Sequence, residues 1–377
     1  MKTILIAPDK FKGTLSANDF CSAVEKGLGQ QITDFNIISI PLSDGGEGFL
    51  EVMRKTGRYL LLSAEVKDPL GRQIRTEYLS SQDGKRSVIE VAKLIGLQLF
   101  RKHEYNCLIM NTYGLGQLIQ QVYKEGVEEI DIGIGGTATT DAGAGMACAL
   151  GYKFLDKNNR VILPSGVNLR QIHRIIPPAK AGKIRIKING LCDVSNPMYG
   201  ENGAALVFAR QKGADDEGVR ILDEGLQNMA FLIEKEIGIQ VQDVPGSGAG
   251  GALGAGILAF LGGSLKSGAG YIMEESGFNK YIHLADLVIT GEGQLDEQSR
   301  NGKLCVAVCR KSREYDKKVI AIVGSNRWNG TDCFDLICSL EEAAGNELDP
   351  FKDAALLVGK ITAKMLTNGI LNKIINS

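Results

Sequence analysis

Histidine and clustered cysteine are scarce in this chain of 377 residues. The histidines are His103, His173 and His283, and the eight cysteines form no C-x-x-C pair. A zinc site built from Cys and His needs ligands at short, regular spacing, so this composition argues against one. We expect the cysteines to be reduced and mostly buried as small hydrophobic side chains.

Excess charge of one sign and long apolar runs are also missing. Lys and Arg number 43 against 44 Asp and Glu, which leaves a formal charge of −1. Nucleic acids and anionic membranes select basic surfaces, so neither is an expected partner. The first apolar run, residues 4–7, is too short for a signal peptide, and no run approaches the ~18 residues of a membrane span. We expect a cytoplasmic protein with small-molecule partners.

Glycine, by contrast, is abundant, with 47 residues. This is about an eighth of the chain, against a usual ~7%. The glycines gather in short clusters rather than being spread evenly. Clusters of this kind indicate backbone loops shaped around a ligand or around another loop.

Apolar runs alternate with helical patterns along the chain. Ser16 and Asp19 form a capping signal before a helical pattern. A chain of this length exceeds the ~250–300 residues of one core, so two domains are expected. The alternation predicts an α/β fold with largely parallel sheets. The clearest strands are expected at residues 4–7, 35–40, 129–134, 287–290 and 319–323, and further helices at 48–54, 116–124 and 216–237.

Four expected strands end in loops that combine glycine or asparagine with carboxylates. In open α/β sheets, ligands bind outside the carboxyl ends of the strands, where such loops converge. Asp and Gly are also ordinary turn formers, so a single loop of this kind would say little. Four together indicate a site for a cation and a polar ligand. They span residues 8–13, 43–48, 192–197 and 291–296.

Two further loops, 133–143 and 246–256, are dense in glycine and precede helical patterns. Exposed backbone N–H groups at such a position can bind phosphate. The second loop is equally compatible with a helix whose small residues allow close packing. No G-x-x-x-x-G-K-[ST] motif is present, so bound ATP would not use a P-loop.

The first glycine loop also allows a dehydrogenase. It matches G-x-G-x-x-A from Gly133, and Asp156 follows 23 positions later, close to a dinucleotide fingerprint. Its Thr-Ala-Thr-Thr-Asp insert, however, puts the Asp141 carboxylate where a pyrophosphate would lie. An NAD-dependent oxidoreductase using the Gly133–Asp156 region therefore remains the alternative enzyme.

Seven ordered stretches together resemble the bacterial-type glycerate kinases, which phosphorylate glycerate from ATP, typically to 2-phosphoglycerate. Their order and spacing hold across nearly the whole chain, which makes the resemblance far more specific than any single loop. The stretches are APDKFKGTLSA (7–17), PLSDGGEG (41–48), DPLGR (68–72), IGIGGTATTDAGAGM (132–146), CDVSNPMYGENGAALVFARQKGA (192–214), DVPGSGAGGALGAGILAFLGG (243–263) and LVITGEGQLDEQSRNGK (287–303).

The resemblance implies a flavodoxin-like parallel-sheet domain built from both chain ends and a second α/β domain inserted into it. Turn signals near residues 68–72 and 281–284 suggest the boundaries, giving 1–69 plus 284–377 for the first domain and 70–283 for the second. The active site would lie in the cleft between the domains. ATP and Mg²⁺ are the implied cofactors, and a homodimer is possible.

Asp193 and Asp296 are the candidates for the catalytic base and the metal ligand, in either order. Phosphoryl transfer needs a hydroxyl in line with the γ-phosphate, a cationic clamp and an acceptor for the hydroxyl proton. Mg²⁺ needs only one or two carboxylates beside phosphate oxygens and water.

The remaining candidates would hold the substrate and the nucleotide. Lys12 and Arg72 are expected to bind the glycerate carboxylate, while Asp44 and Glu47 orient hydroxyls or a metal-bound water. The nucleotide and its phosphates are assigned to Gly135, Gly136, Thr137, Thr139, Asp141, Lys212, Gly248, Gly250 and Gly251.

Three departures from the family pattern stand out. Lys10 replaces a usual Ser, Thr140 replaces a usual Asn, and the segment 324–340 is shortened. They leave open a third alternative, a homologue that binds a small molecule without catalysis.

Overall fold

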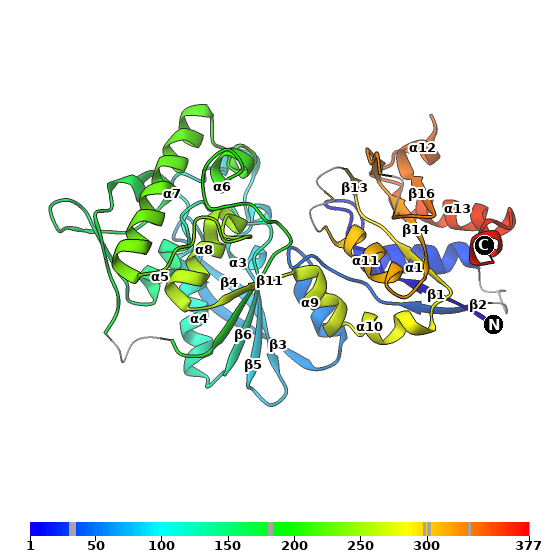
Figure 1. The fold of residues 1–377 in the computed structure, drawn as a ribbon, viewed down its shortest axis with the longest axis horizontal. Coiled ribbons are helices and arrows are strands. Elements are labelled where there is room, and N and C mark those ends of the chain that lie inside the picture. Colours follow the sequence, from blue (N-terminus) through cyan, green and yellow to red (C-terminus); the bar gives the residue numbers. More distant parts are fainter. Residues whose placement is uncertain (30–34, 180–183, 297–298, 300–302, 331–332, 377) are drawn as a thin grey trace. The chain divides into compact units, whose positions relative to one another are not determined.

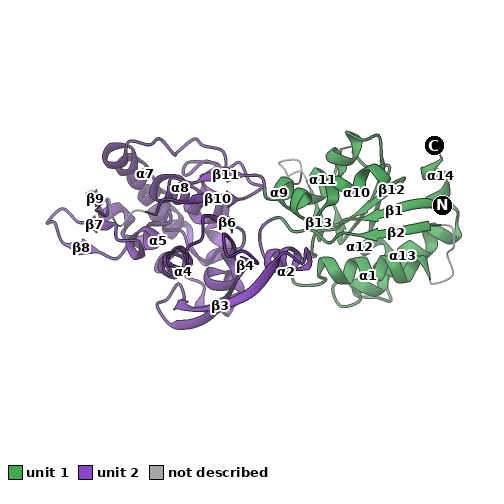
Figure 2. Cartoon of the chain, turned by 90° about the horizontal axis from the view of Figure 1, so that it is seen from below, with its two compact units in different colours: residues 1–44, 268–377 green, residues 45–267 purple. Residues whose placement is uncertain are grey.

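The computed structural model describes residues 1–29, 35–179, 184–296, 299, 303–330 and 333–376 (Figure 1). Contacts between residues divide the chain into two compact units (Figure 2). Unit 1 comprises residues 1–44 and 268–377, and unit 2 comprises residues 45–267. Unit 1 is therefore assembled from both ends of the chain.

Both boundaries lie earlier in the chain than the sequence suggested. The turn signal at Asp68 is a hairpin inside unit 2, joining β3 (Tyr59–Lys67) to β4 (Gln73–Ser81). The Asp68 carboxylate accepts the backbone N–H groups of Leu70 and Arg72, each at 2.9 Å. A turn of this chemistry marks a hairpin as readily as a domain boundary. At the second boundary, α9 (Gly268–Glu275) and α10 (Phe278–Tyr281) belong to unit 1.

Unit 1 is built on a parallel sheet that, among the described residues, has five strands in the order β16-β14-β12-β1-β2. Read from β2, this is the 2-1-3-4-5 order of flavodoxin-like doubly wound sheets. The register pairs Ile6 of β1 with Ile289 of β12. The strands are β1 (Lys2–Ile6), β2 (Phe35–Ser39), β12 (Leu287–Thr290), β14 (Lys318–Val323) and β16 (Leu336–Ser339).

Helices cover both faces of this sheet. Alternate residues of β14 enter different cores: Ile320 and Ile322 join the core that includes α1 and α13, whereas Ala321 and Val323 join that of α11. Ser16 caps α1 by accepting the Asp19 N–H at 3.1 Å, as its capping signal predicts. The helices are α1 (Ala17–Leu28), η6 (Ile282–Leu284), α11 (Leu304–Arg313), α12 (Leu340–Ala344), α13 (Ala354–Thr367) and α14 (Ile370–Ile375).

Within the segment 324–340, β15 (Ser325–Asn326) pairs with β13 (Gln294–Leu295). Residues 331–332 of this segment lie outside the described residues, as do residues 297–298 and 300–302 of the motif at 287–303.

One pair of cysteines departs from the expectation that all are reduced. Cys309 of α11 and Cys333 form a disulfide, with their Cα atoms 6.1 Å apart. Such a separation suits a disulfide, and no spacing rule in the sequence reveals it. Among the described residues, no other cysteine forms a disulfide.

Unit 2 is built on a mixed sheet that, among its described residues, has six strands in the order β11-β10-β6-β5-β4-β3. The strands from β11 to β5 run parallel, while β4 and β3 continue the sheet as antiparallel strands. A smaller antiparallel sheet contains β7 (Lys153–Leu155), β8 (Val161–Ile162) and β9 (Arg174–Ile176). The other strands are β5 (Arg86–Glu90), β6 (Glu129–Gly133), β10 (Lys187–Leu191) and β11 (Ser264–Lys266).

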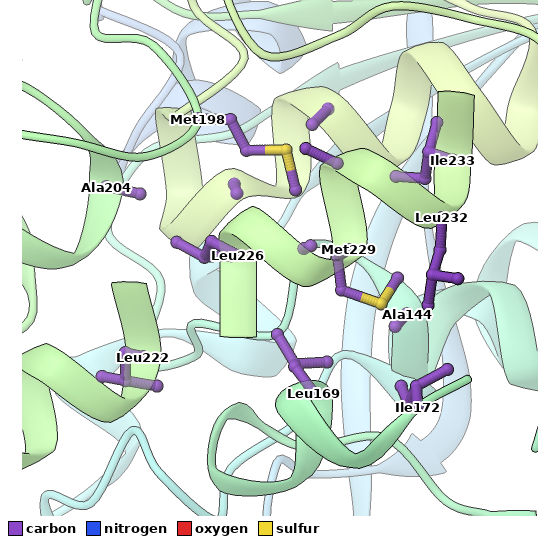
Figure 3. Close-up of a cluster of buried hydrophobic side chains, with 14 of the residues drawn as sticks. Ala144, Leu169, Ile172, Met198, Ala204, Leu222, Leu226, Met229, Leu232 and Ile233 are labelled. Atoms are coloured by element: carbon purple, nitrogen blue, oxygen red, sulfur yellow. The ribbon is translucent and has the colours of Figure 1, made fainter. Parts of the chain in front are cut away.

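The long helix α7 (Asp216–Ile237) supplies much of one core of unit 2. Apolar residues at helical spacing on this helix are buried, as the sequence pattern predicts. Figure 3 shows several of them beside Leu169, Ile172 and Met198. The helix begins at Asp215, whose carboxylate accepts the Gly218 N–H at 2.8 Å.

A second core of unit 2 lies against the large sheet, where helices including α4 and α8 pack on β5 and β6. The helices are α2 (Phe49–Lys55), α3 (Ala92–Ile95), η1 (Leu97–Leu99), η2 (Lys102–Glu104), α4 (Tyr113–Lys124), α5 (Ala144–Ala149), η3 (Gly166–Gln171), α6 (Ala204–Phe208), η5 (Arg210–Lys212) and α8 (Ala249–Leu261). None of the helices in the described ranges combines the length and the apolar character needed to span a bilayer.

Candidate functional site

The carboxyl ends of β1 and β12 bring two acidic loops of unit 1 side by side. The ladder continues past the strands, since the Asp9 N–H donates to the Gly291 carbonyl at 2.8 Å. Extending the register that pairs Ile6 with Ile289 places Asp9 beside Glu292. In the 2-1-3-4-5 order, this pair of strands forms the topological switch point, where doubly wound sheets bind their ligands.

Asp9 and Glu292 are both buried, with 8% and 5% of their surfaces exposed. Burial raises the pKa of Asp9 to about 7, against the opposing charge of Lys10. Burial also raises the pKa of Glu292 to about 8, opposed by Lys303 and reinforced by Asp9. Among the described residues, Oε1 of Glu292 has no hydrogen-bond partner. Within the described part of the chain, the pair is therefore short of compensating positive charge.

Two lysines near this pair lie closer to other carboxylates. Lys10 Nζ lies 3.2 Å from Asp44 Oδ1 but 4.0 Å from Asp9 Oδ1. Lys303 Nζ lies 3.1 Å from Asp296 Oδ1. With every group ionised, four carboxylates and two ammonium groups leave two excess negative charges at these strand ends. Lys10 thus adds positive charge to an acidic cluster.

Asp296, a candidate base or metal ligand, is firmly held within unit 1. Its Oδ1 also accepts the Ser299 N–H at 3.1 Å, and its Oδ2 accepts from Gln294 at 3.1 Å. Partial burial acts against ionisation, but the hydrogen bond and charge of Lys303 outweigh it and lower the pKa of Asp296. Asp296 is thus ionised and paired.

Of the other substrate candidates, Lys12 lies in the exposed turn of residues 11–15 in unit 1 and forms no ion pair with any residue that the structure describes. Glu47 belongs to unit 2 and is exposed just before α2. Lys12 can therefore meet a carboxylate from solution.

Arg72 is less available for a substrate. Its guanidinium group contacts Asp68 at 2.6 Å and Glu104 at 3.1 Å, and lies 5.2 Å from the centre of the Phe100 ring. The side chain is 53% exposed. A substrate carboxylate would have to compete with two carboxylates of the same unit, so the geometry favours a role in fixing the hairpin turn.

The first glycine loop of unit 2 follows β6 and packs closely on the Gly45–Gly46 backbone. A Cβ atom on Gly133 would lie 2.1 Å from the Gly45 carbonyl oxygen, and one on Gly135 would lie 2.6 Å from the Gly46 Cα atom. Gly135 is half-buried and Gly136 is exposed. Their backbone remains a candidate for phosphate contact.

Lys212 holds this loop from inside unit 2. The residue is 3% exposed, and its ammonium group donates to Thr137 Oγ1 at 3.0 Å and to the Thr139 carbonyl at 2.8 Å. Burial lowers the pKa of Lys212 to about 8, and the nearby Cys107 and Asp141 oppose this shift. A lysine in this position fixes the loop rather than reaching a ligand outside it.

Asp141 is likewise an interior acceptor. Its fully buried carboxylate accepts the Thr112 N–H and hydroxyl, both at 2.8 Å, and the Gly145 N–H at 3.1 Å. Burial raises the pKa of Asp141 against these hydrogen bonds. Direct phosphate binding by Thr139, Asp141 or Lys212 would require the loop to open.

The second glycine loop packs against the first. Gly250, Gly251 and Ala252 adopt left-handed backbone angles at the start of α8. A Cβ atom on Gly251 would lie 2.1 Å from the Thr139 carbonyl oxygen, and one on Gly248 would lie 2.2 Å from the Pro197 carbonyl oxygen. The structure thus shows the close-packed small-residue helix that the sequence left as one of two readings.

Asp193 follows β10 in unit 2 and is half-buried. Its Oδ1 accepts the Ser267 hydroxyl at 2.8 Å. Asp296 belongs to unit 1. The two aspartates expected to share the chemistry thus come from different units.

The structure does not support a dinucleotide-binding site in the Gly133–Asp156 region. After β6, the chain enters α5 and then β7. Strand β7 belongs to the small antiparallel sheet and does not pair with β6. Asp156 closes the β7–β8 hairpin, its Oδ1 accepting the N–H groups of Asn158 and Arg160 at 2.8 Å each. A Rossmann site needs a βαβ unit here, so the Gly133–Asp156 region cannot bind NAD in that way.

Sequence reasoning missed the buried carboxyl pair Asp9 and Glu292 and the lysines near it. Both acids stand in the acidic loops 8–13 and 291–296, where the later Asp296 is an equally good candidate by sequence. Their position in the sequence could have indicated Asp9 and Glu292, since each follows an apolar strand by a few residues. Only the strand order shows that the two strands are neighbours.

The fold and these loops define an α/β enzyme whose acidic strand ends suit a cation and a polar ligand. Residues 4–363 match the model of the glycerate kinase family. The chain is 42% identical to a glycerate kinase of Halalkalibacterium halodurans over 86% of each chain, and 40% identical to the glycerate 2-kinase of Escherichia coli over 85% of each. The chain belongs to the glycerate kinase family and is an ATP-dependent kinase.

A solved structure extends the likeness to the fold. The crystal structure of a chain provisionally called glycerate kinase 2, from Salmonella typhimurium LT2, matches with a TM-score of 0.80 and 33% identity over 99% of both chains. The acidic and glycine loops described above all fall within the matched residues 4–363.

Proposed function

We propose that the chain transfers the γ-phosphoryl group of ATP to a hydroxyl of glycerate and yields 2-phosphoglycerate. The observation that carries this proposal is the similarity to glycerate kinases, one of them named a glycerate 2-kinase, over 85% or more of each chain. The acidic strand ends support it, because phosphoryl transfer depends on positioning and charge neutralisation more than on covalent chemistry.

In this proposal, Asp193 accepts the proton of the attacking hydroxyl, and Ser267 orients its carboxylate through the 2.8 Å hydrogen bond. A base acts only when it is held within reach of the proton it takes. Asp296 stays ionised beside Lys303 and contributes negative charge at the strand ends. Asp193 is proposed as the base because its partner is the neutral Ser267 hydroxyl, whereas Asp296 is already paired with the charged Lys303.

Lys12 is the proposed ligand of the glycerate carboxylate, because it is exposed and forms no ion pair with a described residue. Asp44 and Glu47 are proposed to orient hydroxyl groups. The phosphates of ATP are assigned to the backbone of Gly135 and Gly136, with Lys212 holding the loop from behind through Thr137 and Thr139.

Magnesium fits the donor chemistry at the strand ends of unit 1. Among the described residues, no three or more His, Cys, Asp or Glu side chains are grouped to hold a metal. Mg²⁺ commonly takes only one or two carboxylates and fills its other positions with water and phosphate oxygens. When bound, it would neutralise charge on the β- and γ-phosphates.

The test is phosphorus NMR of the product formed from ATP, Mg²⁺ and each enantiomer of glycerate. The proposal predicts the 2-phosphoglycerate resonance with at least one enantiomer. A product phosphorylated at the 3-position would overturn the regiochemistry and leave the kinase class intact. No turnover by a folded sample would favour the non-catalytic binding homologue. Sedimentation of the same sample tests the proposed homodimer.

A further inference from the structure

The strand ends of unit 1 contain a buried carboxylate that the proposed reaction has not used. Glu292 is 5% exposed, and its Oε1 lacks a hydrogen-bond partner among the described residues. An ionised carboxylate left without a partner in the interior is costly, so such groups are paired or bind a cation. The position of this atom therefore points to a ligand.

A second buried carboxylate, Asp9, lies beside Glu292 and adds to the negative charge that must be compensated. Asp9 is also buried, and the β1–β12 ladder places it beside Glu292 through the 2.8 Å bond from the Asp9 N–H to the Gly291 carbonyl. In-register neighbours on parallel strands point to the same face of a sheet. Two like charges are therefore directed to one place at the switch point.

The lysines do not meet this need. Lys303 donates to Asp296 at 3.1 Å, and Lys10 is nearer to Asp44, at 3.2 Å, than to Asp9, at 4.0 Å. With every group ionised, the four carboxylates and two lysines described here keep two excess negative charges, which equals the charge of one divalent cation. Hard oxygen donors of this kind favour Mg²⁺ over softer metals.

The geometry points to Asp9 and Glu292 as the protein ligands of a divalent cation at the carboxyl ends of β1 and β12. The inference rests on the proposed function only in taking that cation to be the Mg²⁺ that accompanies ATP. It moves the metal ligands away from Asp193 and Asp296, both of which already accept hydrogen bonds from neighbouring side chains. Two carboxylates leave the remaining positions for water and phosphate.

The experiment is a titration of the full chain with MnCl₂, followed by electron paramagnetic resonance, with and without a non-hydrolysable ATP analogue. We expect one Mn²⁺ per chain, displaced by MgCl₂ and not by KCl. Glu292→Gln and Asp9→Asn should each weaken Mn²⁺ binding by about tenfold or more, which corresponds to ~1.4 kcal/mol. Thermal unfolding in EDTA checks that both variants fold, and MgCl₂ should raise the midpoint of the wild type more than that of Glu292→Gln or Asp9→Asn.

Asp286→Asn is the matched control. Asp286 precedes β12 at the opposite end of the same sheet, where its carboxylate accepts the Thr3 N–H at 2.7 Å and faces Lys2. The Asp286→Asn substitution removes one carboxylate charge, as Asp9→Asn and Glu292→Gln do, and should leave Mn²⁺ binding unchanged. Wild-type-like binding in Glu292→Gln and Asp9→Asn, or no Mn²⁺ bound by the wild type in either condition, would overturn the cation site. Glycerate phosphorylation, measured separately, reports on the proposed function.

Discussion

At the scale of single residues, burial separates side chains that the sequence could not rank. Asp193, Asp296, Asp141 and Glu292 all stand in acidic or glycine-rich loops. Asp141 is an interior hydrogen-bond acceptor, whereas Glu292 is buried with one oxygen that has no partner among the residues the structure describes. A sequence shows which residues are acidic but not how many donors surround each one. The resemblance to the family could therefore indicate which loops form the site, but only the packing distinguishes the roles of the acidic residues within those loops.

Lys212 gives a prediction about pH at this scale. Its folded-state pKa of about 8 lies below the ordinary 10.5, so between these values the unfolded chain binds more protons than the folded chain. The free energy of unfolding then rises with pH. Relative to Lys212→Met, the wild type should gain about 2 kcal/mol between pH 7 and 9.5.

Urea unfolding at the two pH values measures this difference. Cys107 and Asp141, which face the ammonium group, are present in both proteins, and burial raises the pKa of each. Parallel dependence on pH in the wild type and the variant would show that Lys212 is not titrating in this range.

At the scale of elements, the sequence pattern located most strands and helices closely. Helix α7 and strand β12 have the bounds that the apolar pattern indicates. The left-handed start of α8 could not be predicted, because its conformation depends on the contact of Gly251 with the Thr139 carbonyl. The sequence predicts a domain boundary at the Asp68 turn because local turn chemistry does not reveal that β3 and β4 pair across it.

The packing of α1 on α13 provides an element-scale prediction with its own control. A Cβ atom on Gly27 of α1 would lie 2.4 Å from the Gly359 carbonyl oxygen, whereas one on Gly359 of α13 would meet the Ala23 carbonyl oxygen at 3.4 Å. Both changes to alanine gain up to ~1 kcal/mol of helix propensity. Gly27→Ala should nevertheless lose ~1–3 kcal/mol of stability through overpacking.

Gly359→Ala should be neutral or stabilising by up to ~1 kcal/mol. The midpoints of urea unfolding compare the two variants directly. Equal stability of both variants would mean that α1 and α13 do not approach each other as closely as described.

At the scale of the whole molecule, the sequence indicated an α/β protein in which both chain ends contribute to one parallel sheet. The seven stretches carried that expectation, because composition alone could not have shown that β1 lies beside β12, where Ile6 pairs with the sequence-distant Ile289. The boundaries were misplaced because β3 and β4 form one hairpin. The disulfide between Cys309 and Cys333 was missed because their proximity depends on tertiary packing.

The central claim is that phosphoryl transfer depends on carboxylates at strand ends of both units. Steady-state kinetics of Asp193→Asn and Asp296→Asn, beside Asp286→Asn, test it most directly. We predict that kcat with glycerate falls about 10²-fold or more in the first two variants, because Asp193→Asn removes the proposed general base and Asp296→Asn removes the carboxylate that holds Lys303 at the strand ends. Asp286→Asn should keep wild-type kcat. A kcat within about twofold of wild type in either Asp193→Asn or Asp296→Asn, from folded protein, would contradict the account.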